Sequence, residues 1–445
     1  MSKMESIKAV DLARMEKTYR ANEKARIIRN ALTCNDISKI AVVQESKAAN
    51  PNLFSVDIKT MKATNQLRSG RCWIFSAMNV LREIIARKYK IEEFELSQNY
   101  IAFYDKLEKA NWFMECIMQE LDSPIGSETN RWLLENGIGD GGQWDMLVSL
   151  VKKYGICPKT AYPESYQAGS TGRMNQLLNQ RLKRFALDAR KLHAEGNDKQ
   201  IKAVRSKALS ECYGLICDCF GVPPKSFTFE YYDSRKKYHA VNDVTPAEFY
   251  EKYLAEDLDN YVVIINAPTD DKPYYKTYTV KYIGNVVAGN PVRYLNLPMN
   301  EFKNAVIAQM KDGSPVWFGC DCSKDGDREN GLWDDMQFDF ENTFDMKLDM
   351  TKAEMLDARF SAMNHAMVLT GVNLSGRKPA RWKIENSWGD KSGIQGYYIC
   401  SDTWFDRYVF EAAVNKKYLT AEQQKMLRQE PAVLDPWDPF GTLAD

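Results

Sequence analysis

The sequence changes character along its length, and this change limits the folds that the chain can adopt. In the first part, residues 73–89 and the stretch from Asp145 to Tyr154 carry apolar side chains at helical spacing. After Gly313, short apolar runs bounded by glycine recur, namely PVWFGC, HAMVLTGV, RWKIEN and GYYIC, and such runs are typical of antiparallel strands. Helices early and strands late predict an α+β fold with two lobes.

The middle of the chain differs from both of these parts. A long polar helical stretch covers Arg173 to Leu215, and a tyrosine-rich stretch of alternating polarity, which favours strands, covers Phe227 to Leu295. A chain of 445 residues has room for two or three domains of ordinary size. We therefore interpret residues 165–300 as an insertion into the two-lobed fold.

Composition excludes several classes of protein. Sixty Lys and Arg balance sixty Asp and Glu, so no global field would attract nucleic acid or an anionic membrane. No window approaches the roughly 18 apolar residues of a membrane span, and the first residues lack the apolar stretch of a signal peptide, so the expected location is the cytoplasm. Ten cysteines are too few for a disulfide scaffold, and their spacing matches no zinc site, so we predict no metal.

The chain has three histidines, which makes the search for a catalytic base short. His193 in KLHAEGNDK and His239 in KKYHAVND lie in charged surroundings and are expected on solvated faces. His365 opens the apolar run AMVLTGV, where a strand would hold its imidazole rigidly. A lone histidine in such a run is usually a core residue, so the assignment depends on its partners.

Four other residues supply those partners. Cys72 precedes an apolar helix, and a helix N-terminus favours the reactive thiolate, although a buried inert cysteine is the commoner case. Gln66 offers a side-chain amide that, with the backbone N–H of Cys72, could stabilise an oxyanion. Asn386 could fix the tautomer of His365, and Trp388 could shield that hydrogen bond. These residues predict nucleophilic catalysis by a Cys-His-Asn set.

The segments QLRSGRCWIFS, NHAMVLTGV and ENSWG resemble the three active-site blocks of the papain family. That family places the histidine and asparagine about 130–150 residues after the nucleophile. Here they follow Cys72 by 293 and 314 residues, and the excess is close to the length of the insertion at 165–300. With SWGDKSG, SDTWF and DPWDP, the chain more narrowly resembles the branch of bleomycin hydrolases and bacterial aminopeptidases C.

This resemblance implies a papain-like core, a ring-shaped homohexamer whose active sites face an internal cavity, and no cofactor. In this branch a C-terminal arm enters the cleft, and its terminal carboxylate meets the α-ammonium of the substrate; here that carboxylate belongs to Asp445 or, if Asp445 is self-trimmed, to Ala444. The expected activity is that of a cysteine aminopeptidase that acts on peptides with a free N-terminus through a thioester, with bleomycin-hydrolase-like activity left open. Predicted parts are an N-terminal helical arm (1–55), a helical lobe with the nucleophile (56–164), an inserted helical and hook-like region (165–300), a β lobe with His and Asn (301–429) and the C-terminal arm (430–445).

The glycine-rich segment GIGDGGQW resembles the papain-family loop that binds the peptide backbone. The resemblance assigns close approach of the peptide to Gly141 and Gly142, and places Met146 beside the adjacent pocket. The same segment spells the dinucleotide fingerprint G-x-G-x-x-G, but the strand that should precede it is missing, so no nicotinamide site is predicted. Ser69 stands where secreted relatives carry a disulfide cysteine, which agrees with a reducing compartment.

Three alternatives stay open at this point. Residues 173–207 hold ten Lys or Arg against three acids, which would suit nucleic-acid binding, although a solvated helix face is the commoner reason for such a run. An inactive scaffold with a peptidase fold is the second alternative, disfavoured because all four active-site residues are present. The third concerns the C-terminal arm, since chain ends are usually disordered; against this, Trp437 and Phe440 give the arm apolar anchors.

Overall fold

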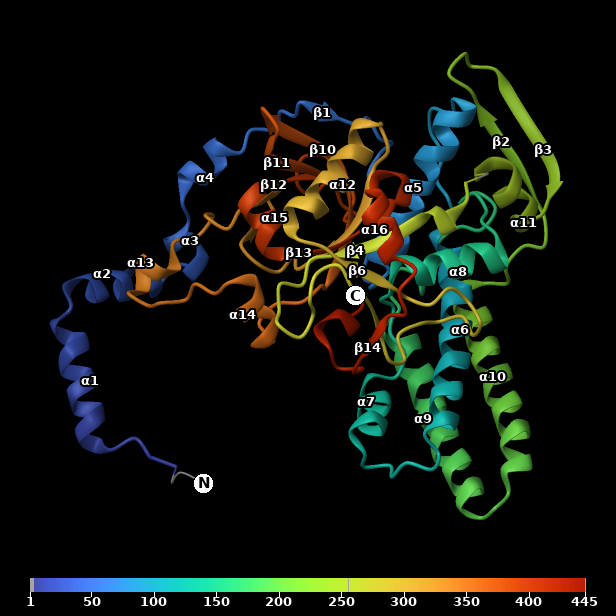
Figure 1. The fold of residues 1–445 in the computed structure, drawn as a ribbon, viewed down its shortest axis with the longest axis horizontal. Coiled ribbons are helices and arrows are strands. Elements are labelled where there is room, and N and C mark those ends of the chain that lie inside the picture. The colour runs from blue at the N-terminus through green and yellow to red at the C-terminus, as the bar shows by residue number, and fades with distance from the viewer. Residues whose placement is uncertain (1–3, 255, 445) are drawn as a thin grey trace.

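The computed structural model describes residues 4–254 and 256–444, and Figure 1 shows a helical part beside a large sheet. The helical lobe contains α5 to α8, and the predicted helices within 73–89 and 145–154 are confirmed as α5 and α8. An antiparallel pair, α9 and α10, packs along α6. The bounds are α5 (Cys72–Tyr89), α6 (Gln98–Gln119), α7 (Glu128–Asn136), α8 (Trp144–Tyr154), α9 (Gly172–Ala194) and α10 (Asp198–Phe220).

Helix α5 is the buried centre of the helical lobe. Its side chains from Cys72 to Arg82 are all buried, because α6 and α8 pack against it on one side and the sheet covers the other. The helix ends at Lys90, which adopts a left-handed conformation (φ 54°). A helix enclosed in this way fixes the position of its first residue, Cys72, relative to the sheet.

The four late apolar runs form neighbouring strands of the large sheet, as predicted. Strand β10 lies between β7 and β11, and both pairs are antiparallel, with His365 opposite Cys320. The order along the sheet is β14-β5-β6-β4-β13-β7-β10-β11-β12-β9-β8, with β1 paired to β10. The strands of this late part are β7 (Val316–Cys320), β8 (Gly326–Asp327), β9 (Leu332–Trp333), β10 (His365–Ser375), β11 (Lys378–Glu385), β12 (Tyr397–Ser401), β13 (Val409–Asn415) and β14 (Ala432–Leu434).

The sheet also takes in strands from within the 165–300 segment. Strand β4 pairs antiparallel with β13, and β6 pairs with both β4 and β5. Among the described residues from 165 to about 260, none joins this sheet: the α9–α10 pair packs along α6, and the β2–β3 hairpin forms a separate two-stranded sheet that projects at the top of Figure 1. The elements are β2 (Phe227–Tyr232), β3 (Tyr238–Val244), α11 (Pro246–Phe249), β4 (Tyr261–Ile265), β5 (Thr277–Val280) and β6 (Tyr294–Asn296).

The N-terminal arm leads away from this body. Helices α1 and α2 bury no side chain, and Figure 1 shows them projecting beyond α3, α4 and α13. No helix within the described ranges is long and apolar enough to cross a membrane. The remaining bounds are α1 (Ala9–Ala21), α2 (Glu23–Leu32), α3 (Ile37–Ala41), α4 (Gln44–Ala49), β1 (Val56–Asp57), α12 (Met299–Lys311), α13 (Phe340–Phe344), α14 (Lys352–Asp357), α15 (Asp402–Tyr408) and α16 (Ala421–Met426).

Candidate active site

Cys72 lies where the helical lobe meets the sheet. It is the first residue of α5, its side chain is buried, and the backbone N–H of Ala366 on β10 lies 3.4 Å from its Sγ. The first N–H groups of a helix point along its axis and carry partial positive charge, which favours a thiolate at this place. The predicted nucleophile and the residue next to the predicted base are therefore in contact.

His365 is held by the end of the neighbouring strand. It is the first residue of β10, and its Nε2 lies 2.9 Å from Oδ1 of Asn386, which directly follows β11. The same oxygen accepts the backbone N–H of Ser387 at 2.7 Å. Because this oxygen can only accept, Nε2 carries the hydrogen and Nδ1 is the basic nitrogen. The predicted orienting role of Asn386 has the geometry that it requires.

Trp388 covers this pair. Its ring stacks on the imidazole of His365 with 5.0 Å between centroids and 27° between planes, and the guanidinium of Arg328 lies 4.5 Å from the same indole. This stacking is the arrangement that the predicted shielding of the bond between His365 and Asn386 requires. The shielding role of Trp388 and its assignment to substrate binding both stay predictions.

The surroundings of His365 make it a weak base. Burial lowers the pKa of its imidazole to about 4, against the opposite effect of the hydrogen bond with Asn386, and the charge of Arg328 lowers it further. An imidazolium in this place therefore needs an anion beside it, and a thiolate at Cys72 would supply one.

We expect the reactivity of Cys72 to persist in acid and to fall only near pH 4 or below. The thiol proton can pass to His365 only while the imidazole is in its basic form, and that form is lost as pH falls through about 4. The rate of Cys72 modification by a disulfide reagent, measured from pH 3 to pH 9, checks this. In His365→Ala the pH at which this rate falls to half its maximum should move to the ordinary pKa range of a thiol, about 8.5. A half-maximal rate near that pH in the unaltered protein would contradict the pairing of Cys72 with His365.

Replacing Asn386 by Ala should be damaging but not fatal. The variant loses the acceptor that fixes the tautomer and the ring position of His365, but the imidazole itself remains. General base catalysis typically accelerates a reaction by about 10²–10⁴-fold. Because Asn386→Ala weakens this catalysis without removing the base, we expect kcat to fall by about 10- to 100-fold. Steady-state kinetics on an aminoacyl reporter provide the measurement, and near-UV circular dichroism confirms the fold. A variant as inactive as one without the nucleophile would give Asn386 a larger role.

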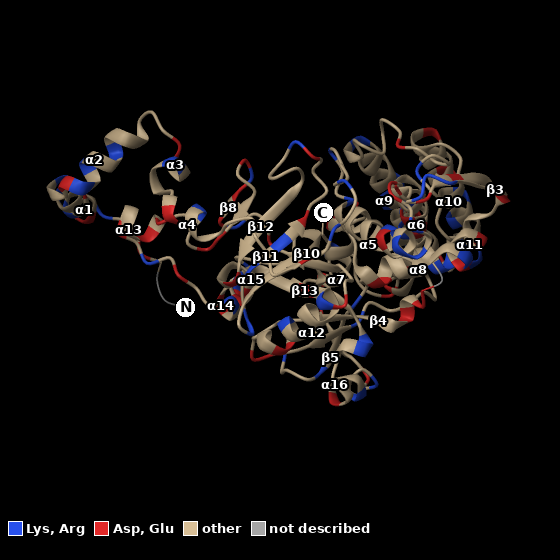
Figure 2. Ribbon diagram, turned by 90° about the horizontal axis from the view of Figure 1, so that it is seen from above, with Lys and Arg blue, Asp and Glu red and all other residues tan. Residues whose placement is uncertain are grey.

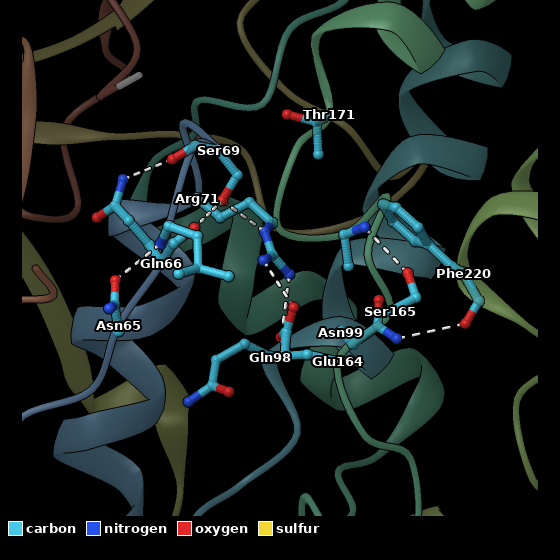
Figure 3. A network of polar contacts seen from close by, with 12 residues as sticks. Asn65, Gln66, Ser69, Arg71, Gln98, Asn99, Glu164, Ser165, Thr171 and Phe220 are labelled. Atoms are coloured by element: carbon cyan, nitrogen blue, oxygen red, sulfur yellow. Dashed lines mark hydrogen bonds and ion pairs between the residues drawn. The ribbon is translucent and has the colours of Figure 1, made fainter. Parts of the chain in front are cut away.

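Gln66, the residue predicted to hold the oxyanion, is fixed by hydrogen bonds at both ends of its side-chain amide. Its side-chain Nε2 donates to the carbonyl of Ser69 at 2.6 Å, and its Oε1 accepts from Oγ of Ser387 at 2.5 Å (Figure 3 shows the first contact). The backbone N–H of Gln66 also donates to the carbonyl of Ser387 at 2.9 Å. One of the two hydrogens on Nε2 is thus committed to Ser69, and the other can serve an oxyanion.

The C-terminal arm packs against the glycine loop. Ala444 forms an antiparallel bridge with Gly142, and Nε2 of Gln143 donates to the carbonyl of Thr442 at 3.1 Å. A Cβ on Gly141 would come within 2.5 Å of the carbonyl oxygen of Ala444, and Ala444 is fully buried. The two predicted glycines do bring a peptide backbone close, and the peptide is the chain's own end.

Contacts farther back anchor the arm. Strand β14 pairs parallel with β5, the hydroxyl of Tyr294 donates to the carbonyl of Phe440 at 3.1 Å, and Lys272 pairs with Asp438 at 2.8 Å. Phe440 is itself buried. The alternative of a disordered tail is therefore wrong for the arm through residue 444, and Asp445, the predicted carboxylate donor, lies outside the described residues.

Glu411 lies beside the arm and was missed by the sequence reasoning. This β13 residue, with Gln143, Phe440 and Thr442, lines a small cavity under the arm. Its Oε1 has no hydrogen-bond partner among the described residues, and burial raises its pKa to about 8, helped by Asp145. A protonated carboxyl group is therefore the form that suits the docked arm at neutral pH.

Asp140 ties the glycine loop to the nucleophile and was also missed. Its carboxylate accepts the backbone N–H of Gly70 at 2.9 Å and pairs with Lys106 at 2.5 Å, and its carbonyl accepts Nε1 of Trp73 at 2.7 Å. Burial opposes ionisation of Asp140, but Lys106 and the hydrogen bond from Thr171 hold its pKa well below the usual range. The loop that binds the arm is thus fixed to the residues flanking Cys72.

The remaining predicted positions lie elsewhere. Met146 belongs to the apolar core of the helical lobe and does not line the small cavity beside Glu411. Its role in a substrate pocket stays a prediction. His193 is held by Asp122 and Asp198 on the surface, and His239 lies on the β2–β3 hairpin. Across the described ranges, no cluster of three or more His, Cys, Asp or Glu side chains could hold a metal ion.

The basic segment on α9 and α10 is partly neutralised within the chain. Arg181 pairs with Glu211, and Arg184 pairs with Asp188. Figure 2 shows Lys and Arg interspersed with Asp and Glu over this part of the molecule. These pairs reduce the positive field that nucleic acid would require.

Together the fold and the site define the papain-like class of cysteine peptidases, with an α+β architecture as predicted. The chain belongs to the Peptidase C1-like family, which matches residues 6–441. It is 45% identical to Aminopeptidase C of Lactobacillus delbrueckii subsp. lactis over 422 residues, 94% of each chain, and 43% identical to Aminopeptidase C of Listeria monocytogenes, with 97% of this chain and 98% of the relative covered. The crystal structure of PepW from Lactobacillus rhamnosis HN001 is 44% identical, covers 99% of both chains and has a TM-score of 0.97.

Proposed function

We propose that the protein is a cysteine aminopeptidase that removes N-terminal residues from peptides through a thioester on Cys72. The observation that carries this proposal is the pairing of Ala444 with Gly142, because the arm then lies on the glycine loop to which the family resemblance assigns the substrate backbone. An arm in that place would leave little space for substrate residues before the scissile bond. The relatives named Aminopeptidase C agree with this polarity.

The positions of the site residues support the following reaction. The Cys72 proton passes to Nδ1 of His365, and Sγ attacks the scissile carbonyl, whose oxygen becomes an oxyanion held by Gln66 and the Cys72 N–H. When the C–N bond breaks, His365 gives its proton to the leaving amine, and a thioester remains. His365 then takes a proton from water as that water attacks the thioester, which releases the carboxylic acid and restores the thiol.

The end of the arm supplies the proposed recognition of the substrate's ammonium group. A carboxylate that follows Ala444, or that of Ala444 itself if Asp445 is removed, would lie at the end of the groove that Gly142 defines. A charge-assisted hydrogen bond to an α-ammonium is stronger than a neutral one. Peptides with a blocked amine would lose that bond and meet the arm.

A panel of aminoacyl reporters with free and blocked amines tests the proposal. Free-amine reporters should be cleaved, blocked ones should not, and activity should need a reducing agent and resist chelators. Cleavage of both kinds at equal rates would overturn the aminopeptidase assignment. Adding bleomycin to the same panel tests the bleomycin-hydrolase-like activity that the family resemblance suggests.

The cytoplasm is the proposed location, and a homohexamer is the proposed assembly. No disulfide joins any of the cysteines in the described ranges, and Cys34 is exposed, which suits a reducing compartment. Helices α1 and α2 expose Val10, Leu12, Tyr19 and Ile27, and apolar side chains on a projecting arm support contact with other copies of the chain. Sedimentation velocity with and without residues 1–32 measures this contact. A DNA shift assay at two salt concentrations tests the weaker proposal of nucleic-acid binding.

A further inference from the structure

A chain of polar contacts leads from the surface of the helical lobe to Gln66. Figure 3 shows its members: Glu164, Arg71, Ser69 and Gln66. The guanidinium of Arg71 meets the carboxylate of Glu164 with both terminal nitrogens, at 3.2 and 2.8 Å, and its Nε donates to Oγ of Ser69 at 2.9 Å. Arg71 precedes the nucleophile directly, and its side chain is 1% exposed.

Ser69 holds Gln66 at two points. Its hydroxyl donates to the backbone carbonyl of Gln66 at 2.7 Å, and its own carbonyl accepts Nε2 of the Gln66 side chain at 2.6 Å. Because Nε of Arg71 donates to the Ser69 oxygen, the hydroxyl hydrogen must point away from Arg71, toward Gln66. Arg71 therefore sets the direction of the hydrogen bond that closes this turn.

The position of Arg71 is itself fixed by a charge. A guanidinium fork and a carboxylate meet in a bidentate geometry that a lysine cannot reproduce. The ring of Phe75 lies 5.1 Å from the guanidinium carbon, so the group is confined from that side as well. The turn that contains Ser69 is thus held by noncovalent contacts, and no disulfide joins the cysteines of the described residues.

We propose that Arg71, fixed by Glu164, is a positioning residue that acts through Ser69 to hold the amide of Gln66 at the oxyanion site. The proposal rests on the thioester mechanism above and adds a named support for one of its steps. It requires that loss of the relay affect the step in which the carbonyl oxygen becomes negative, and leave the thiol itself unchanged. A role in general stability would instead affect both.

Two measurements on the full-length protein separate these cases. The first is kcat and KM on a free-amine reporter, since an interaction made only in the transition state appears in kcat. The second is the rate at which 2,2′-dipyridyl disulfide modifies Cys72. In that reaction the thiolate attacks one sulfur, the S–S bond of the reagent breaks, a mixed disulfide forms on Cys72, and pyridine-2-thione leaves with the electron pair. No carbonyl takes part, so no oxyanion forms.

Ser69→Ala removes the relay with little change of volume, and Glu164→Gln removes the charge while keeping the side-chain shape. We expect Ser69→Ala to lower kcat by about 10- to 100-fold. This effect is smaller than the loss of an oxyanion donor would cause, because the Gln66 amide is displaced and not removed. Glu164→Gln should lower it less. KM and the rate of Cys72 modification should stay at the values of the unaltered protein in both variants.

Arg71→Lys tests the relay itself. Alone it should resemble Ser69→Ala, and the double variant should be no worse than Ser69→Ala, because both changes break the same chain of contacts. Lys303→Met is the matched control: Lys303 on α12 is similarly buried and pairs with Asp402 at 2.7 Å, away from Cys72. It should leave kcat unchanged.

Each remaining outcome overturns the proposal. If Ser69→Ala and Arg71→Lys keep full kcat, Gln66 needs no such support. If kcat and the rate of Cys72 modification fall together, or the two losses multiply, the residues act as general scaffold. Failure of the proposed function would look different, because the reagent would then modify Cys72 of the unaltered protein without abolishing turnover.

Discussion

Replacing Cys72 by Ser should abolish peptide turnover, with a fall in kcat of about 10⁴-fold or more, because loss of a nucleophile removes the covalent route entirely. The hydroxyl nearly matches the thiol in size, but its proton is far harder to remove beside a base as weak as His365. Steady-state kinetics on a free-amine reporter measure the loss. Thermal unfolding should stay close to that of the unaltered protein.

The control for this variant is another buried cysteine. Cys157 lies in the core of the helical lobe, and burial raises the pKa of its thiol above the ordinary range, so Cys157→Ser should keep turnover. Mass mapping of the unaltered protein after brief alkylation should find Cys72 modified ahead of the other cysteines. Full activity in Cys72→Ser would remove Cys72 from the mechanism.

Deleting residues 442–445 should convert the aminopeptidase into an enzyme that also cuts within peptides. The deletion removes Thr442 and Ala444, whose backbones pair with Gln143 and Gly142, and so frees the groove for residues upstream of the scissile bond. It also removes the carboxylate that would select an α-ammonium. We expect amino-blocked peptides to become substrates, with a gain of about 10²-fold or more in their kcat/KM. The deletion removes the arm that excludes them, and it removes the charged contact that favours free amines over them.

The comparison uses free and blocked peptides of one sequence, with products identified by mass spectrometry. The same deletion in Cys72→Ser should show no cleavage, which ties the new activity to the same thiol. Sedimentation velocity should show that the assembly is retained, since the deletion leaves α1 and α2, the proposed contact with other copies, unchanged. An unchanged preference for free amines would mean that another wall of the cleft selects the N-terminus.

Sequence reasoning located the chemistry because few residues could perform it. With three histidines in the chain, only His365 opened an apolar strand, and the helix after Cys72 followed from local spacing. Helix α8 and the antiparallel strands β7, β10, β11 and β12 were predictable for the same reason, since periodicity is a local property.

The parts that were missed depend on contacts between distant segments. Arg71 and Glu164 are 93 residues apart in the sequence, and Gly70 and Asp140 are 70 residues apart. A local sequence pattern therefore cannot predict either contact. Strand β4 was placed in the insertion because its sequence cannot show that β13 completes its hydrogen bonds. A hint did exist at Arg71, because an arginine directly before a nucleophile at a buried helix start requires a partner.

The docking of Ala444 against Gly142 makes the last described residues part of the surface that the glycine loop presents. A purification tag or fusion partner placed behind residue 445 would have to continue from the fully buried Ala444, and would either crowd the glycine loop or pull the arm away from it. Preparations with and without such an extension would then differ in specificity.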